Sequence, residues 1–310
     1  MTSTAIAVSG LRKAFKDKVV LDGIDLEVPA GSIFSLLGPN GAGKTTTVNV
    51  LTTLIGADGG TARVAGYDVQ TDAKAVRAAI GVTGQFAAVD ELLTGRENLQ
   101  LMVDLSRSVD GDVVQKLLDR FDLTGSADKA VSTYSGGMSR KLDLAMTLVG
   151  NPQIIFLDEP TTGLDPRSRR TMWTIIRELV ADGVTVFLTT QYLEEADQLA
   201  DRIAVLDQGR LVAQGTPDEL KRQLPGTHVR LRFTTPAELD AASRLFPDAT
   251  RDDEALALKV PSDGGTKSLR GVLDRLDEYE LSAEEFSVHT PDLDDVFLAL
   301  TGHTTEVVAS

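Results

Sequence analysis

The sequence has no cysteine and no long apolar segment. The absence of thiols excludes disulfides, thiolate metal sites and a cysteine nucleophile, and it is typical of a reducing compartment. The strongest apolar runs, residues 153–157 and 184–188, are far shorter than the roughly 20 residues that a membrane-spanning helix needs. Residues 1–8 lack the basic segment and apolar stretch of a secretory signal. We therefore expect no direct membrane insertion, so that any membrane role depends on a partner.

Positive charge is in deficit, with 31 Lys and Arg against 46 Asp and Glu and a formal net charge of -15. A polyanion would be repelled, so we expect no nucleic-acid partner. We interpret the acidity as a solvated surface that keeps the protein in solution. The 42% hydrophobic content is ample for well-packed cores, and 310 residues suffice for one large domain and one small one.

Short apolar runs alternate with helical periodicity over much of the chain. Residues 5–8 and 19–28 alternate in polarity and predict an antiparallel β-layer, and residues 32–37 form an apolar run that leads into a glycine-rich loop. Further predicted strands are residues 153–157, 184–189 and 203–206, and predicted helices include 45–54, 168–181 and 193–200. This order predicts an α/β fold with a mainly parallel sheet.

The pattern changes twice along the chain. Residues 87–149 have helical periodicity and few strand signals, which predicts an inserted helical subdomain. Pro225 and Gly226 interrupt the pattern, so we expect one domain over residues 1–225 and a second over 226–310. Predicted elements of the second domain are strands 228–233, 255–260 and 285–289 and helices 236–246, 269–279 and 293–300. They indicate a small α+β domain of roughly eighty residues.

The glycine-rich loop fits the phosphate-loop pattern and lies between a buried strand and a helix start. Its successive N–H groups and the helix N-terminus favour the phosphates of a nucleotide. Lys44 is expected to contact the β- and γ-phosphates, and the Thr45 hydroxyl to ligate Mg²⁺. The flanking elements argue against a glycine-rich turn with a chance lysine. The predicted nucleotide-binding residues here are Gly38, Pro39, Asn40, Gly41, Ala42, Gly43, Lys44, Thr45 and Thr46.

Two adjacent carboxylates, Asp158 and Glu159, follow the apolar run at 153–157. This places them at the carboxyl edge of a buried parallel sheet, beside the phosphates. Asp158 is expected to hold the Mg²⁺ shell, since a hard cation prefers oxygen ligands. Glu159 is expected to polarise the attacking water as a general base. An isolated Asp-Glu pair is usually a solvated turn, but its position after a wholly apolar strand argues against that interpretation.

A third motif, residues 134–138 with the sequence Tyr-Ser-Gly-Gly-Met, lies at a predicted helix start. It resembles the signature of the ABC ATPase family. The resemblance implies that Ser135, Gly136 and Gly137 contact the γ-phosphate of a nucleotide bound by the opposite subunit. A lone Ser-Gly-Gly would be an ordinary N-cap turn, but its place before the Asp158 strand favours the functional interpretation. Met138 stands where the family usually has glutamine.

Three smaller pieces fall in the order that this resemblance implies. Gln85 resembles the glutamine that senses Mg²⁺ and the attacking water. Asp165, in the segment Gly163-Leu164-Asp165, resembles the loop that crosses the dimer interface. Phe15 resembles the aromatic platform that stacks on adenine, with a core aromatic of the first β-layer as the alternative.

Gln191 stands where most of the family has a histidine. Glutamine can donate a hydrogen bond to a γ-phosphate but cannot carry charge or shuttle a proton. Together with the signature and the ending at 291–300, it makes the chain similar to the daunorubicin/doxorubicin-resistance type of ABC ATPase from actinobacteria. That likeness implies an ATP- and Mg²⁺-dependent exporter of drugs or lipids, a separately encoded permease, a homodimer of ATPase subunits and a peripheral place on the cytoplasmic face of the membrane. It also implies a regulatory or dimerising C-terminal domain.

Other classes stay open at this point. A soluble ABC ATPase would carry two ATPase units or a long inserted coiled coil, and the sequence has neither pattern. An importer subunit shares the motor motifs, although Gln191 and the ending favour export. A non-catalytic nucleotide-binding regulator is disfavoured because Lys44 and Glu159 are both present.

Overall fold

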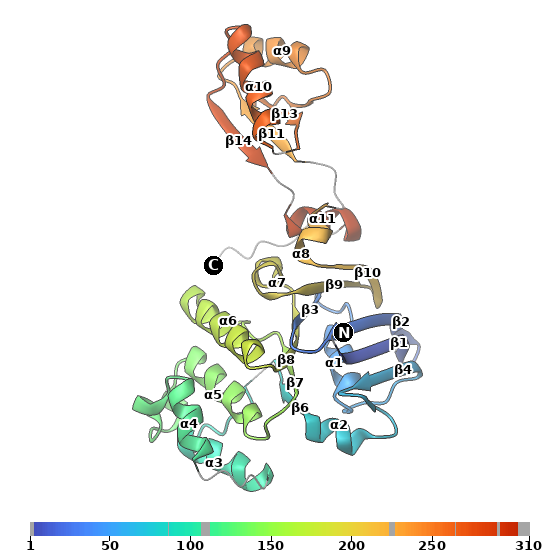
Figure 1. Ribbon diagram of the computed structural model, residues 1–310, viewed down its shortest axis with the longest axis vertical. Helices are drawn as coiled ribbons and strands as arrows, with labels where there is room; N and C mark the ends of the chain where they lie inside the picture. The colour runs from blue at the N-terminus through green and yellow to red at the C-terminus, as the bar shows by residue number, and fades with distance from the viewer. Residues whose placement is uncertain are drawn as a thin grey trace. The chain divides into compact units, whose positions relative to one another are not determined.

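The computed structural model describes residues 3–85, 87–106, 112–222, 227–263, 265–289 and 292–302. The chain divides into two compact units, Met1–Pro217 and Asp218–Ser310 (Figure 1). The predicted domain break at Pro225 and Gly226 lies outside the described residues, as does part of the predicted helical subdomain, 107–111. Among the helices that are described, none is long and apolar enough to cross a membrane.

A six-stranded sheet lies at the centre of the first unit, counted over the described residues, in the order β10-β9-β3-β8-β7-β6. The strands are β3 (Ile33–Leu37), β6 (Ile80–Thr83), β7 (Ile154–Asp158), β8 (Thr185–Thr190), β9 (Arg202–Asp207) and β10 (Arg210–Gly215). All neighbours pair in parallel except β10, which is antiparallel to β9. The predicted α/β fold with a mainly parallel sheet is therefore confirmed.

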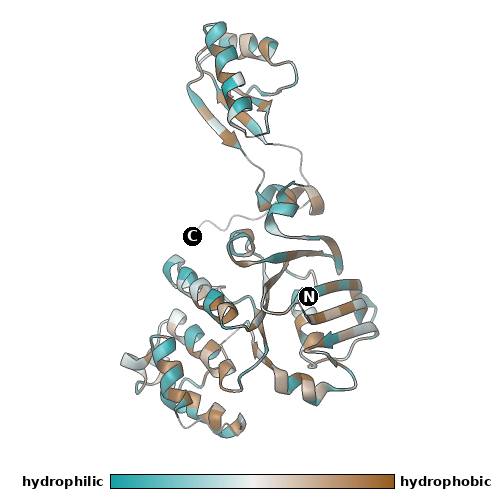
Figure 2. Ribbon diagram, viewed as in Figure 1, coloured by the Kyte–Doolittle hydropathy of each residue, from teal (hydrophilic) through white to brown (hydrophobic). Residues whose placement is uncertain are grey.

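An antiparallel sheet packs beside it, with the order β2-β1-β4-β5. Its strands are β1 (Thr4–Phe15), β2 (Lys18–Pro29), β4 (Gly59–Val64) and β5 (Tyr67–Asp68). Brown and teal bands alternate along β1 and β2 in Figure 2, as expected when one face is buried and the other is solvated. The polarity pattern predicted only parts of β1 and β2. It missed β4, whose Gly60 has φ of +79° and lies so close to Gly10 that a Cβ would meet its carbonyl oxygen at 2.3 Å.

Helices complete the first unit. They are α1 (Lys44–Leu51), α2 (Ala73–Ala79), α3 (Gly95–Ser106), α4 (Val113–Arg120), α5 (Gly136–Leu148), α6 (Pro166–Ala181) and α7 (Leu193–Leu199), with short 3₁₀ turns at Thr124–Ser126 and Val131–Thr133. Helices α3, α4 and α5 form the predicted helical region on one side of the central sheet, and the antiparallel sheet lies on the other (Figure 1).

The central strands are buried on both faces, and alternate side chains enter different cores. Ile155 and Leu157 of β7 pack in a cluster with residues of α5 and α6. Phe156, between them, packs with Phe34 and Phe187 against the antiparallel sheet and α1. This two-sided burial explains why the strands are apolar without alternation. The burial of these strands also holds in place the polar residues that follow them.

The second unit is an antiparallel sheet with helices, and it confirms the predicted α+β class. Its elements are α8 (Pro217–Arg222), β11 (His228–Arg232), α9 (Pro236–Leu245), β12 (Thr250–Asp252), β13 (Ala257–Pro261), α10 (Thr266–Glu278), β14 (Glu285–His289) and α11 (Leu293–Thr301), and the strand order is β12-β13-β11-β14. Val229, Leu231 and Phe233 form its core with residues of α9 and α10. Capping boxes at Thr235 and Asp292 satisfy free N–H groups where α9 and α11 begin.

Candidate active site

Four neighbouring parallel strands deliver predicted site residues to one edge of the central sheet. The glycine-rich loop follows β3, Gln191 follows β8, Glu159 follows β7, and Gln85 comes two residues after β6. These strands are adjacent in the order β3-β8-β7-β6. The carboxyl ends of parallel strands meet at one edge, which is where α/β folds bind ligands.

The phosphate loop, residues 38–45, needs glycine at specific positions. Gly41 and Gly43 have φ of +80° and +114°, where other residues are strained. A Cβ at Gly38 would meet the backbone oxygen of Leu206 at 2.3 Å, and one at Gly43 would meet Leu21 at 2.8 Å. Helix α1 then begins at Lys44, so its first N–H groups point toward the loop. The loop thus offers a backbone lining suited to phosphate oxygens.

Lys44 and Glu159 form a buried ion pair at this edge. Their Nζ and Oε1 atoms are 3.2 Å apart, and both side chains are buried. The Lys44 ammonium also donates to the Gly38 oxygen at 2.8 Å. The other oxygen of Glu159, Oε2, accepts from Gln85 Nε2 at 3.5 Å and from the Thr162 hydroxyl at 3.3 Å. Three of the predicted catalytic residues are therefore in direct contact.

The backbone of Glu159 is held in the left-handed region, with φ of +50°. A non-glycine residue there costs on the order of 1–3 kcal/mol and persists only where neighbours fix it. Thr189 of β8 supplies part of that support, since its backbone oxygen and hydroxyl accept from the Glu159 N–H at 3.2 Å and 3.1 Å. The same hydroxyl donates to Asp158 Oδ1 at 2.5 Å. The turn thereby places Asp158 and Glu159 side by side, as the sequence predicts.

The signature residues meet the Asp165 segment rather than the phosphate loop. Ser135 caps α5, its hydroxyl accepting from the Met138 N–H at 3.3 Å. A Cβ at Gly137 would meet the Ser168 hydroxyl at 2.7 Å, and that hydroxyl donates to Asp165. Asp165 in turn caps α6, and the Ser168 hydrogen bonds hold the pKa of its carboxyl below the ordinary value. Ser135 and Gly136 are exposed, and a Cβ at Gly136 would lie 3.9 Å from the Leu164 side chain.

The other predicted residues have simple placements. Phe15 ends β1 with 48% of its surface exposed, 5.4 Å from the Lys13 ammonium, so the alternative of a core aromatic is wrong. Thr45 is exposed and Thr46 half-buried in the first turn of α1. Gln191 is half-buried directly after β8. The oxygen donors Thr45 and Asp158 fit a hard cation such as Mg²⁺, which is commonly bound through one or two carboxylates plus substrate phosphates.

Arg140 is a residue of this region that the sequence did not single out. It lies on α5, is buried, and donates to backbone oxygens beside both Gln85 and Glu159. In the sequence, Arg140 and Asp143 look like an ordinary surface ion pair at i, i+3 spacing. The available signal in the sequence is that Arg140 and Asp143 lie close to Leu142, Leu144 and Ala145, apolar residues that the structure buries.

Glu195 is the second such residue. It is fully buried on α7, and its Oε1 accepts from the Thr161 hydroxyl at 2.8 Å and from the Trp173 indole N–H at 3.0 Å. Burial raises the pKa of its carboxyl, and the hydrogen bonds oppose that rise only in part. Glu195 thus connects the segment after Glu159 to α6 and to the helix that follows Gln191.

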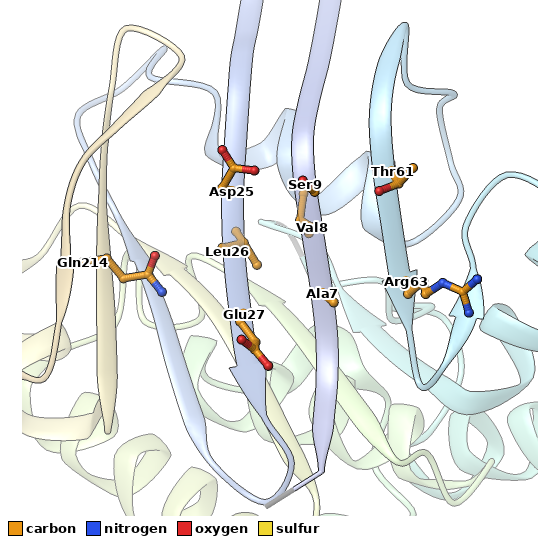
Figure 3. Close-up of a pocket in the computed structure, with 9 residues that line it drawn as sticks. All are labelled: Ala7, Val8, Ser9, Asp25, Leu26, Glu27, Thr61, Arg63 and Gln214. Atoms are coloured by element: carbon orange, nitrogen blue, oxygen red, sulfur yellow. The ribbon is translucent and has the colours of Figure 1, made fainter.

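A shallow groove of about 400 Å³ lies on the antiparallel sheet, away from these residues (Figure 3). It is lined by Ala7, Val8, Ser9, Asp25, Leu26, Glu27, Thr61, Arg63 and Gln214. Its charged groups have structural partners: Asp25 accepts from the Gly10 N–H, Glu27 from the Thr4 hydroxyl, and Arg63 donates to the Gly66 oxygen. The groove therefore adds no chemistry to the site.

Comparison with known proteins agrees with this geometry. The family model described as ABC transporter matches residues 21–162. The daunorubicin resistance ATP-binding protein DrrA3 of Streptomyces coeruleorubidus is 48% identical to the chain, with 97% of each protein covered. The chain belongs to the ATP-binding proteins of the ABC transporter family. It is an ATPase subunit, and the family match includes the phosphate loop and the Asp158-Glu159 turn.

The relatives of this ABC ATPase carry more than one kind of name. The Nod factor export ATP-binding protein I of Paraburkholderia xenovorans is 37% identical, covering 97% of this chain and 98% of that protein. A solved ATP-binding cassette of an ABC transporter in its ADP conformation is 25% identical, covers 70% of this chain and 93% of that chain, and has a TM-score of 0.65. The recognised family and the ATPase fold are thus confirmed.

Proposed function

We propose that this ABC ATPase powers export of drugs or lipids through a separately encoded permease, working as a homodimer on the cytoplasmic face of the membrane. The observation that carries the proposal is the division of the site into two groups. Lys44, Glu159 and Gln85 are in contact at the sheet edge. Ser135 caps the start of α5, where Ser135 and Gly136 are exposed, and Gly137 lies against Ser168 of α6.

Two copies paired head to tail would join these groups into complete sites. The phosphate loop of one copy would hold the nucleotide, and Ser135, Gly136 and Gly137 of the other would contact its γ-phosphate with amides and a helix N-terminus. Phe15 would stack on the adenine, since it is an exposed aromatic side chain at the end of β1. ATP then binds the two copies together, and loss of the γ-phosphate contacts separates them.

The catalytic step follows from the contacts of Lys44. When phosphate oxygens take over the Lys44 ammonium, Glu159 loses its ion-pair partner and its carboxylate can accept a proton from water. The water oxygen attacks the γ-phosphorus, the bond to the bridging oxygen breaks, and ADP and phosphate form. Thr45, Asp158 and Gln85 are the residues that would hold Mg²⁺, which supplies neutralisation of phosphate charge when bound. Gln191 would donate a hydrogen bond to the γ-phosphate.

The relatives support export without fixing the cargo. One is named for daunorubicin resistance and another for Nod factor export, which are chemically different compounds. Because both kinds of relative align over 97% of this chain, the cargo would be chosen in the permease rather than in the ATPase. Exposed Leu92, Leu101 and Leu105 lie in and before α3 and provide apolar surface for such a partner.

The test is affinity purification of Glu159→Gln from detergent-solubilised native membranes with ATP and Mg²⁺. A polytopic membrane protein recovered at equal stoichiometry, identified by mass spectrometry, supports the proposal. Lys44→Ala is the matched control, because it should lose the nucleotide and therefore the ATP-dependent part of the assembly. Recovery of ribosomal proteins, or of no partner, would instead indicate a soluble ABC ATPase.

A further inference from the structure

Arg140 joins the signature helix to the turn that carries the catalytic carboxylates. Its side chain leaves α5 one turn after the helix begins and is 7% exposed. Nε donates to the Pro160 oxygen at 3.0 Å, and Nη2 donates to the oxygens of Asp158 and Glu159 at 3.2 Å and 3.4 Å. Three successive carbonyls of this turn are therefore held by one guanidinium, including that of the residue with positive φ.

The same guanidinium reaches the loop that carries Gln85. Nη1 donates to the Gly84 oxygen at 2.7 Å and to Asp143 Oδ2 at 3.3 Å. Asp143 in turn accepts from the Ala88 N–H at 3.0 Å, so the pair holds this loop on both sides of Gln85. A guanidinium has five N–H groups, and these contacts supply an acceptor for each of them.

The charge of Arg140 persists in this buried place. Burial lowers the pKa of its guanidinium, while Asp143, Asp158 and Glu195 oppose the change. A guanidinium begins from so high a pKa that it stays protonated in proteins. A buried ion pair is by itself weak evidence for stability, because desolvation offsets much of the attraction. The arrangement of the carbonyl contacts is therefore the informative feature, rather than the ion pair.

We propose that Arg140 is a positioning residue for ATP hydrolysis, which fixes Glu159 and Gln85 relative to the signature helix. The inference rests on the proposed function, because it requires the two groups of the site to act on one nucleotide in a dimer. Engagement of a partner's γ-phosphate by Ser135 moves or holds α5. Through its hydrogen bonds, Arg140 couples the position of α5 to the loops that carry Gln85 and Glu159 in its own protomer, and these residues orient the attacking water. Lysine cannot replace it, since an ammonium has three donors and no planar fork.

The decisive variant is Arg140→Lys in the full chain. We expect kcat for phosphate release to fall about 10²-fold, the loss typical of a misplacement near 1 Å. The dissociation constant of a fluorescent ATP analogue should change less than about twofold, because the phosphate loop is untouched. Binding stoichiometry measured in the same sample corrects for any unfolded fraction. Lys141→Arg, on the same helix but half-buried, is the matched control and should keep the wild-type kcat.

A second measurement separates positioning from damage to the signature segment. Glu159→Gln and the double variant Glu159→Gln, Arg140→Lys are compared by size-exclusion chromatography with and without ATP. Both should form ATP-dependent dimers, because Ser135 and the phosphate loop are unchanged. An unaltered kcat in Arg140→Lys, or failure of only the double variant to dimerise, would overturn the positioning role. Absence of turnover in the wild-type chain would instead refute the proposed function on which the role depends.

Discussion

The two units of the chain use their sheets differently. The first buries β3, β7 and β8 on both faces and ends each strand in polar residues. The second covers its sheet with α9 and α10 but leaves most of β14 exposed, including Phe286 and Val288. Charged groups of the second unit serve surface ion pairs, such as Arg251 with Asp240. The candidate catalytic residues lie where an apolar strand ends, because a polar contact is electrostatically stronger in such a buried place than at the surface.

The largest expected effect lies at one such strand end. Glu159→Gln removes the general base while keeping the size of the side chain, so phosphate release should fall by about 10²–10⁴-fold. ATP binding should persist, since Lys44 and the loop remain. Rapid-quench phosphate release with a parallel binding titration measures both quantities. Turnover near the wild-type rate would show that Glu159, although it lies at the end of a buried strand, is not the general base.

The next effect concerns the core of the second unit. Leu231→Ala removes a fully buried side chain, so that unit should lose about 2–5 kcal/mol of stability. Limited proteolysis with mass spectrometry should release peptides of residues 227–302 first, while the remaining fragment still binds ATP. Leu188→Ala, in the core of the first unit, is the matched control and should abolish ATP binding instead. Loss of ATP binding in Leu231→Ala would mean that the units do not fold independently.

Glu195 gives a smaller effect within the first unit. Glu195→Ala leaves the Thr161 hydroxyl and the Trp173 indole without their acceptor, at a cost on the order of 3 kcal/mol. Glu195→Gln keeps an oxygen acceptor and should cost less than about 1 kcal/mol. Urea unfolding followed by circular dichroism compares the variants. Equal losses in both would show that the negative charge, rather than the accepting oxygen, is what the site requires.

The same carboxyl predicts a pH dependence. Its folded-state pKa is raised above the ordinary 4.5 by burial. The stability that it contributes is therefore complete below about 4.5, the unfolded value, and is lost as pH rises through the folded pKa. Glu195→Gln should lack this decline, so the stability of the variant relative to wild type should rise with pH in that window. A constant difference across the window would contradict the raised pKa.

The smallest expected effect is at Gln191. As a neutral donor to the γ-phosphate it should contribute about 0.5–1.5 kcal/mol, so Gln191→Ala should slow turnover roughly 2- to 10-fold. Gln191→His introduces the histidine that most of the family has at this position. It tests whether a group that can carry charge or shuttle a proton increases the rate of turnover. Steady-state ATPase assays suffice. Unchanged turnover in Gln191→Ala would remove this residue from the catalytic group.

The fold was largely predictable because burial and periodicity agree in this sequence. Strands such as β7 and β8 contain continuous apolar runs, and each is followed by a recognisable motif, so their identity and order could be read together. The strands β4, β6 and β10 were missed, since polar residues or glycines interrupt their apolar residues. β4 also depends on a close approach between Gly60 and Gly10 that local sequence does not reveal.

The site was predictable only where the chemistry is local. Lys44, Asp158 and Glu159 belong to short motifs with fixed neighbours, and the structure places them together. Arg140 and Glu195 act through contacts across 20 or more positions of sequence, as in the Arg140 contact to Pro160 and the Glu195 contact to Thr161. Their charges resemble solvated surface groups until the fold buries them. The roles of all these residues in turnover stay predictions for the experiments above.

The hydrogen bond between Trp173 and Glu195 gives the protein a built-in optical reporter. Trp173 is the one tryptophan of the chain and is 6% exposed. All indole emission therefore arises from a single point on α6, beside the buried carboxyl. A shift of its emission maximum on adding ATP would report entry of water at that point without a dye. Since the chain has no cysteine, one introduced thiol would accept an energy-transfer acceptor at a chosen position.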